Sequence, residues 1–145
     1  MPNQVMPTEG PYTYMILRYV HDISTAEFIN VGVVVAACEA PWVAAKFKID
    51  CARVKSAFPS LDTKVFLTRM KRLQACFDAL DAARCSELRA REGMSLEALI
   101  RSVLPLEDSA LHWSPTASGI GSLLAPTLRS LYERFVDRHD SRCRR

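Results

Sequence analysis

Apolar residues run almost without interruption through positions 27–38, and the rest of the predicted fold is arranged around this stretch. It is rich in Val, with one Gly and no Pro, a composition typical of a β-strand. Because side chains alternate between the two faces of a strand, one face is predicted to carry Ile29, Val31, Val33, Val35 and Ala37, and the other Asn30, Gly32, Val34, Ala36 and Cys38. Both faces are mainly apolar, which predicts a central strand.

Two neighbouring segments, 12–20 and 42–49, show the period-two alternation of antiparallel strands. In the second, Phe47 and Ile49 are predicted to face the core, and Lys46 and Lys48 to face solvent. The polar residues 21–26 are predicted to join the first two strands as a loop. A short fourth strand is predicted at 111–114, and the small residues 117–122 are predicted to form a loop.

The rest of the chain is predicted to be mainly helical. A short helix over 51–58 can be capped by Asp50 and stops at Pro59. A longer helix over 61–83 carries an apolar stripe at helical spacing, made of Phe66, Met70, Leu73, Phe77 and Leu80. A short helix near 95–103 and a final helix over 124–137 follow. The predicted fold class is therefore α+β: an antiparallel sheet of three to four strands with two main helices packed on it.

Composition indicates one domain, with a flexible leader over 1–11, a single α+β domain over 12–137 and a basic tail over 138–145. The tail holds four arginines and one aspartate, a balance of +3 that equals the net charge of the whole chain. No apolar run approaches the roughly 20 residues that span a bilayer, and no signal peptide is evident. Five cysteines without a C-x-x-C pair indicate reduced thiols, so we expect a cytoplasmic protein.

Catalytic motifs are hard to find in this sequence. There is no Walker lysine, no G-x-S-x-G serine and no His spacing typical of zinc sites, so no metal or cofactor is expected. The candidate binding residues are instead polar or small positions within the apolar strands: Arg18, Glu27, Asn30 and Gly32. Arg18 can be a rim arginine or an ion-pair partner of Glu27. Asn30 and Glu27 can hold the preceding loop by hydrogen bonds or act directly in function.

The segments Tyr14–Val20 and Glu27–Val33 resemble the opening of an uncharacterised bacterial family, domain of unknown function 3037. The Glu-Phe-x-Asn-Val-Gly-Val core is the most specific part, and the resemblance extends to Leu131–Val136. The chain departs from the family pattern at Ala125-Pro126, where an Asp-Pro helix start is expected. The resemblance implies no established activity. It implies a partner, because members are often encoded beside HipA-like kinases.

Three hypotheses of function follow. The first is a non-catalytic protein-binding or adaptor partner, with a HipA-like kinase as the specific candidate. The second is a nucleic-acid-binding or processing protein that uses a basic helix face and the arginine-rich tail, through Lys64, Lys71, Arg72, Arg142, Arg144 and Arg145. The third is an enzyme whose site lies near Arg18, Glu27 and Asn30, which requires these side chains to converge in a pocket. The oligomeric state is left open.

Overall fold

A computed structural model describes residues 9–22, 24–38, 42–80, 83–87, 98, 100, 110–122 and 125–137. Most of the predicted leader, all of the predicted tail and most of the helix predicted near 95–103 lie outside these residues. The strands are β1 (Glu9–Asp22), β2 (Glu27–Ala37), β3 (Val43–Phe47), β4 (Leu111–Trp113) and β5 (Ala117–Ser122). The helices are α1 (Ala52–Ala57), α2 (Thr63–Asp78) and α5 (Ala125–Tyr132), which continues into the π-helical turn η1 (Glu133–Asp137). The α+β class is confirmed.

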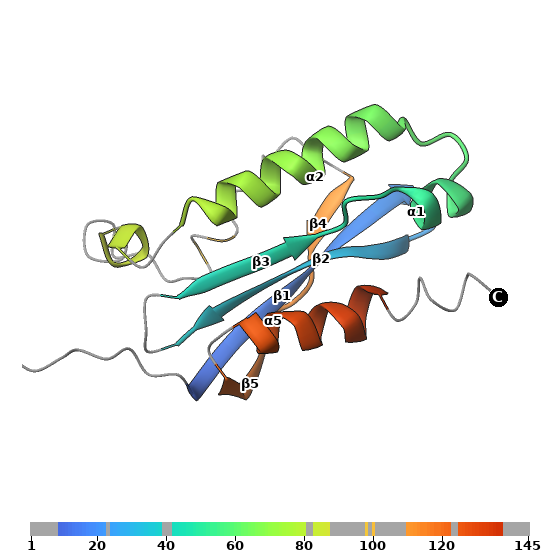
Figure 1. Cartoon of the computed structure of the whole chain (residues 1–145). Coiled ribbons are helices and arrows are strands. Elements are labelled where there is room, and N and C mark those ends of the chain that lie inside the picture. Colours follow the sequence, from blue (N-terminus) through green and yellow to red (C-terminus); the bar gives the residue numbers. More distant parts are fainter. Residues whose placement is uncertain are drawn as a thin grey trace, which may run out of the picture.

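The sheet has five antiparallel strands, with β2 at its centre between β1 and β3 (Figure 1). β4 and β5 lie end to end along the other edge of β1, so this 14-residue strand is internal along most of its length. The sequence predicted a loop at 117–122, and this prediction is wrong. Its small residues have low strand propensity, but pairing with β1 from Glu9–Ser122 to Tyr14–Ala117 outweighs local preference.

A one-residue bulge in β2 overturns the predicted division of its side chains. Leu17 pairs with Gly32, but the next residue of β1, Arg18, pairs with Asn30, so Val31 is extra. The extra residue shifts the alternation by one position. Ile29 and Val31 therefore share the larger core with Val34 and Ala36, whereas Val33 and Val35 face the opposite side. Each face of the sheet thus receives bulky side chains from β2 and can support its own helix layer.

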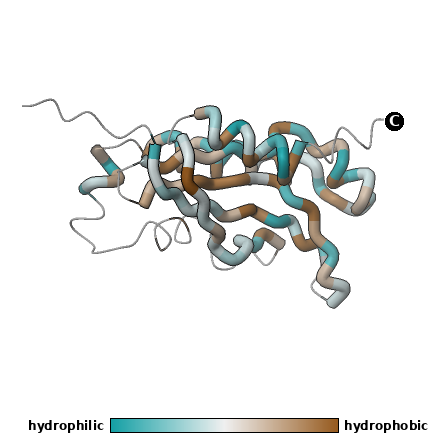
Figure 2. The backbone as a smooth tube through the Cα atoms, turned by 90° about the horizontal axis from the view of Figure 1, so that it is seen from below, coloured by the Kyte–Doolittle hydropathy of each residue, from teal (hydrophilic) through white to brown (hydrophobic). Residues whose placement is uncertain are grey.

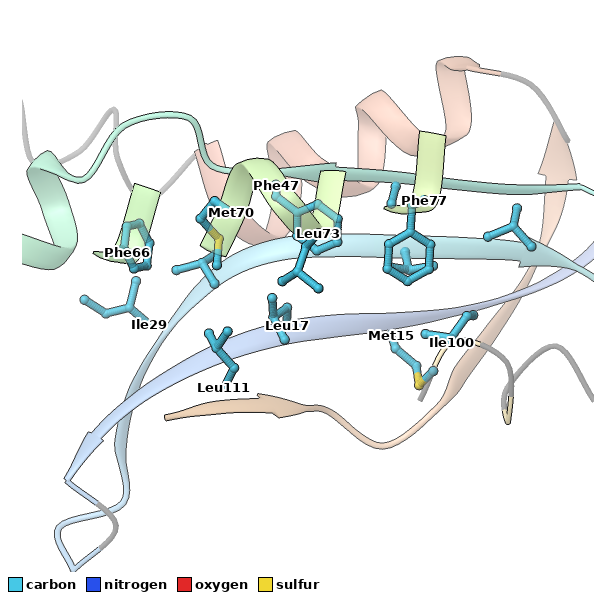
Figure 3. Close-up of a cluster of buried hydrophobic side chains, with 14 of the residues drawn as sticks. Met15, Leu17, Ile29, Phe47, Phe66, Met70, Leu73, Phe77, Ile100 and Leu111 are labelled. Atoms are coloured by element: carbon cyan, nitrogen blue, oxygen red, sulfur yellow. The ribbon is translucent and has the colours of Figure 1, made fainter. Parts of the chain in front are cut away.

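The larger core lies between the sheet and α2 (Figure 3). Asp62 caps α2 by accepting a hydrogen bond from the Val65 N–H, at 3.1 Å. The predicted apolar stripe is confirmed by four buried residues, Phe66, Met70, Leu73 and Phe77. They pack against Met15, Leu17, Ile29, Phe47 and Leu111 of the strands. The helix ends at Asp78, five residues earlier than predicted.

The second, smaller core lies between the other face of the sheet and the C-terminal helix. Leu131, Tyr132 and Val136 of α5 and η1 pack on the opposite face from α2, against Ile16, Val33 and Val35 (Figure 1). Figure 2 shows runs of brown apolar positions along the strands, interrupted by teal hydrophilic ones. The protein is therefore a three-layer structure with one helix layer on each side of the sheet.

The end of β3 corrects a second prediction from the alternating pattern. The strand ends at Phe47, and the next two residues reverse their expected places: Lys48 is buried and Ile49 is 82% exposed. The Lys48 N–H still donates to the Val31 carbonyl, at 2.8 Å. Backbone hydrogen bonding with β2 thus continues to Lys48, but the chain has left the sheet by Ile49.

Two side chains satisfy backbone groups that the sheet itself leaves open. Between β4 and β5 the register with β1 shifts by one residue, because Leu17 pairs with Trp113 and Tyr14 pairs with Ala117. At this junction the Ile16 N–H donates to Ser114 Oγ at 2.8 Å. On the outer edge of β3, Gln74 of α2 accepts from the Phe47 N–H (3.0 Å) and donates to the Ala45 carbonyl (2.8 Å). A side-chain hydroxyl and a side-chain amide thus replace missing strand partners.

Within the described residues, no helix is both long and apolar enough to cross a membrane. Among the described cysteines, Cys38, Cys51, Cys76 and Cys85 form no disulfide. The same part of the chain holds no group of three or more side chains suited to a metal ion.

Candidate protein-binding site

A cavity of about 650 Å³ lies between the start of β2 and helix α1. The turn that precedes β2 places Ala26 at its rim with φ of 59°, a conformation that costs an alanine about 1–2 kcal/mol. The floor is mainly apolar, and the charged side chains belong to three residues. The lining residues are Ala26, Glu27, Phe28, Ile29, Asp50, Ala52, Arg53, Ser56, Ala57 and Phe58.

Phe28 is the most prominent apolar side chain of the cavity. It is 46% exposed, which is unusual for a phenylalanine within a sheet. The guanidinium carbon of Arg18 lies 4.4 Å from the centre of its ring, a cation–π contact worth about 0.5–1 kcal/mol at an exposed site. Arg18 therefore holds the Phe28 ring in place, and an apolar group of a partner would meet a pre-oriented aromatic surface.

The charged residues of the cavity have different surroundings. The side chain of Glu27 is exposed, and its backbone N–H points to Thr25 Oγ1 at 3.4 Å. Asp50 uses its carboxylate locally, because Oδ1 accepts from the Ala52 N–H at 3.2 Å. The N-cap of α1 is Cys51, which makes no side-chain cap hydrogen bond, so Asp50 is not the N-cap residue that the sequence predicted, although it bonds the first N–H of the helix. Arg53 follows in the first turn of α1. The cavity lining therefore combines apolar side chains with both acidic and basic groups.

The three residues of the enzyme hypothesis make separate contacts. Of these residues, Glu27 lines the cavity, Arg18 reaches it only through Phe28, and Asn30 faces η1, where Nδ2 donates to the Phe135 carbonyl at 3.1 Å. Among the described residues, no ion pair joins Arg18 to Glu27. Arg18 Nε and Asn30 Oδ1 are buried and without hydrogen-bond partners in the described structure, although the two residues are paired across β1 and β2.

Asn30 therefore links β2 to the C-terminal helix and does not hold the loop before β2. The contact described in that loop joins the Glu27 N–H to Thr25 Oγ1. The same helix end includes Tyr132, and Lys46 Nζ lies over its ring, 4.5 Å from the ring centre, in a cation–π contact. Burial, and then the nearby carboxylates of Asp137 and Asp50, raise the pKa of Tyr132 above the usual tyrosine value.

Gly32 has a packing role at the β2–β3 pair. A Cβ at this position would lie 2.3 Å from Cδ1 of the Phe47 ring, which crosses over Gly32 from the neighbouring strand. Its lack of a side chain therefore leaves room for the Phe47 ring of the neighbouring strand.

The contacts of His21 beside the cavity were not predicted from the sequence. Its ring stacks on Phe58 with centres 4.5 Å apart and planes 8° apart. Its Nε2 lies 3.1 Å from Ser60 Oγ, and its Nδ1 lies 3.2 Å from the hydroxyl of Tyr19. These contacts join the end of β1 to the segment after α1 and fix the Phe58 wall of the cavity. No local sequence motif predicts these contacts, because His21 and Ser60 are 39 residues apart.

The basic face predicted on the long helix is present on α2. Lys64, Lys71 and Arg72 are exposed, and α2 holds four basic residues against a single acidic one, Asp78. A shallow hollow of about 280 Å³ on this face is lined by Lys64, Val65, Thr68, Arg69 and Arg72. The arginines predicted to extend this surface, Arg142, Arg144 and Arg145, lie outside the described residues.

The sequence model of the family described as "Protein of unknown function (DUF3037)" matches residues 14–136. The chain belongs to this family. The match confirms the resemblance seen in the sequence, and it runs from β1 to η1, so that the cavity and both cores lie within the DUF3037 region. No curated protein and no solved structure matches the chain significantly.

Three residues of the motif Glu27–Val33, which carries the resemblance to DUF3037, have distinct physical roles. Phe28 lines the cavity, Asn30 bonds the C-terminal helix, and Gly32 leaves room for the Phe47 ring. The motif therefore combines fold-defining positions with one exposed aromatic side chain that the sheet does not need for its core.

Proposed function

We propose that this protein is a non-catalytic binding partner that receives a segment of another protein in the cavity between β2 and α1. The observation that carries the proposal is Phe28, a half-exposed aromatic ring that lines a 650 Å³ cavity. The specific candidate partner is a HipA-like kinase, because DUF3037 members are often encoded beside such kinases.

The anatomy of the cavity supports a protein ligand. Protein interfaces concentrate their binding energy in a few aromatic or apolar contacts that are enclosed by polar groups. Here Phe28 and Phe58 supply the aromatic surface, and Glu27, Asp50 and Arg53 supply the charged surroundings. The rings are held by Arg18 on one side and by His21 on the other, which reduces the entropy that binding must overcome.

An enzymatic role has less support from the same residues. Asn30 is engaged with the Phe135 carbonyl and the Asp50 carboxylate with the Ala52 N–H. An acid/base site needs side chains within hydrogen-bond reach of one substrate position. Arg18, Glu27 and Asn30 do not share the cavity in this way, since only Glu27 lines it.

The test is capture of partners from native lysate by the tagged protein, with and without nuclease, followed by reconstitution with the purified partner. Phe28→Asp is the binding variant. Val65→Asp is its control, because Val65 is also 46% exposed but lies on α2, outside the cavity. Thermal melts of both variants establish that they fold.

We expect one stoichiometric protein that survives nuclease, is retained by Val65→Asp and is lost from Phe28→Asp. A HipA-like kinase in that position would identify the partner. Equal binding by both variants would place the interface elsewhere, and a protein that captures nothing would contradict the adaptor role.

A second candidate, nucleic-acid binding, is favoured by the exposed basic face of α2. Phosphate contacts release counterions, so affinity should fall steeply as the salt concentration rises. Replacing Lys71 and Arg72 together with alanine should reduce both the affinity and the salt slope, the slope by roughly two phosphate contacts. An unchanged salt slope would exclude this face as the binding surface.

A further inference from the structure

β5 forms an open edge of the sheet. It pairs with β1 only, and among the described strands none lies on its other side (Figure 1). No residue of its sequence, Ala-Ser-Gly-Ile-Gly-Ser, is charged and none is proline. Natural sheets blunt their edges with lysine, proline, bulges or covering elements, because an open edge is a template for another strand.

The direction of the backbone groups on β5 follows from the bonds of β1. The Pro11 carbonyl accepts from the Cys38 N–H, so the backbone carbonyl of Pro11 points toward β2. The backbone N–H and C=O groups of the next residue, Tyr12, therefore point toward β5. Ile16 lies four residues after Tyr12, so its backbone groups point to the same side. There its N–H donates to Ser114 Oγ, and its carbonyl accepts from the Ser114 N–H. Because Tyr12 pairs with Gly119, the N–H and C=O groups of Ser118 and Ile120 point away from the sheet.

These outward groups are matched by an exposed apolar side chain. Ser118 and Ile120 make no hydrogen bond within the described structure through their outward groups, and the Ile120 side chain is 84% exposed. The other edge of the sheet differs. On β3, the outward N–H of Phe47 and the outward carbonyl of Ala45 are both occupied by the Gln74 amide. On β5, the Ser122 carbonyl accepts from Thr127 Oγ1 of α5, so the free outward groups of this strand are those of Ser118 and Ile120. One edge is therefore protected by a side chain, and the other offers free backbone groups at Ser118 and Ile120.

We propose that β5 pairs with β5 of a second copy of this chain, which makes one continuous sheet across a two-fold axis. In antiparallel self-pairing, the register centred on Gly119 uses the outward N–H and C=O groups of both Ser118 and Ile120. In this register Ser118 faces Ile120 of the second copy and Ile120 faces its Ser118, so that four backbone hydrogen bonds form. Gly119 lies opposite Gly119 of the second copy in a non-hydrogen-bonded pair, where the two Cα atoms are closest. The two Ile120 side chains are diagonal neighbours on one face of the joined sheet.

The side-chain environment of β5 is compatible with this arrangement. Tyr12 covers Gly119 on one face of the sheet, and a Cβ there would lie 2.6 Å from the tyrosine hydroxyl oxygen. The Ile120 side chain lies on the opposite face, because side chains alternate along the strand. The second copy therefore buries an isoleucine that the single chain leaves in solvent.

Sedimentation of the purified chain over a micromolar to millimolar concentration series tests the proposal. We expect a reversible rise from the 16.3 kDa chain mass to twice that mass. Ile120→Pro removes an N–H that bonds nothing in the single chain, so the fold should persist while two of the four intermolecular bonds are lost. The dissociation constant of the dimer should rise by about tenfold or more.

Ile120→Lys, which brings two like charges close to the two-fold axis, should weaken the dimer as well. Ile49→Lys is the matched control, because Ile49 is 82% exposed but lies beyond the end of β3. Circular dichroism and thermal melts confirm folding of each variant. A wild-type chain that remains monomeric over the whole series overturns the proposal, as does a dimer that both Ile120 variants leave unchanged.

Discussion

The Gln74 amide makes a quantitative prediction about the protected edge of the sheet. Its Oε1 accepts from the Phe47 N–H at 3.0 Å, and its Nε2 donates to the Ala45 carbonyl at 2.8 Å. Nε2 also reaches Asp78 Oδ1, at 3.0 Å, one turn further along α2. Gln74→Ala removes all three contacts and leaves two backbone groups of β3 without their side-chain partner.

The magnitude follows from the two bonds to the strand. Each typical intramolecular hydrogen bond contributes about 0.5–1.5 kcal/mol net, so the pair contributes about 1–3 kcal/mol. Alanine has a helix propensity a few tenths of a kcal/mol better than glutamine, which offsets a small part of the loss. We therefore expect a net destabilisation of about 1–2.5 kcal/mol, or roughly 1 M in the urea midpoint for a typical m-value.

Equilibrium unfolding in urea, followed by circular dichroism, measures this loss. Thr68→Ala is the control, because Thr68 is exposed on α2 and its replacement changes helix propensity without touching β3. A Gln74→Ala midpoint equal to that of the wild type would refute the reasoning. In that case water would satisfy the edge of β3 as well as the amide does.

Further predictions concern the two cores and the C-terminal helix. Val33→Asp should prevent folding, because Val33 is fully buried and an unpaired carboxylate there costs more than a marginally stable domain can absorb; a folded variant with an unchanged melting temperature would show that the smaller core is misplaced. Gly32→Ala should lower stability by about 1–3 kcal/mol in urea titrations, since its Cβ would overlap the Phe47 ring. Asn30→Ala should lower stability by about 0.5–1.5 kcal/mol through loss of the bond to the Phe135 carbonyl, and retained stability with lost partner binding would instead assign it to function. Tyr132 has a raised pKa in the folded chain, so the unfolded chain loses this proton first, and stability should fall as the pH rises above about 10; Tyr132→Phe should reduce that fall in urea titrations across this range.

Local pattern was sufficient for most elements of the fold. The apolar stripe of α2, the central position of β2 and the antiparallel hairpin with β1 all follow from periodicity, because burial of one face imposes the spacing of apolar residues. The most specific part of the resemblance to DUF3037, the motif Glu27–Val33, has a related physical basis. Its residues occupy positions with narrow physical requirements, such as Gly32 beneath the Phe47 ring.

The candidate site was predicted only in part. Glu27 was identified as a polar residue at the start of the main strand, and it does line the cavity. Phe28 was passed over, because an apolar residue in an apolar run gives no sign that its ring is exposed. Helix α1 and His21 could not be associated with it either, since their contacts join segments that are distant in sequence.

The sequence by itself determined the α+β class, the order of most elements and the absence of a recognisable catalytic motif. Only the tertiary structure decided which face each β2 side chain occupies, because a single bulged residue at Val31 inverts the alternation beyond it. It alone decided that 117–122 is a strand, since long-range pairing with β1 outweighs the weak preference of small residues. Periodicity reports which residues prefer burial, whereas register and edge exposure depend on partners that a local pattern does not encode.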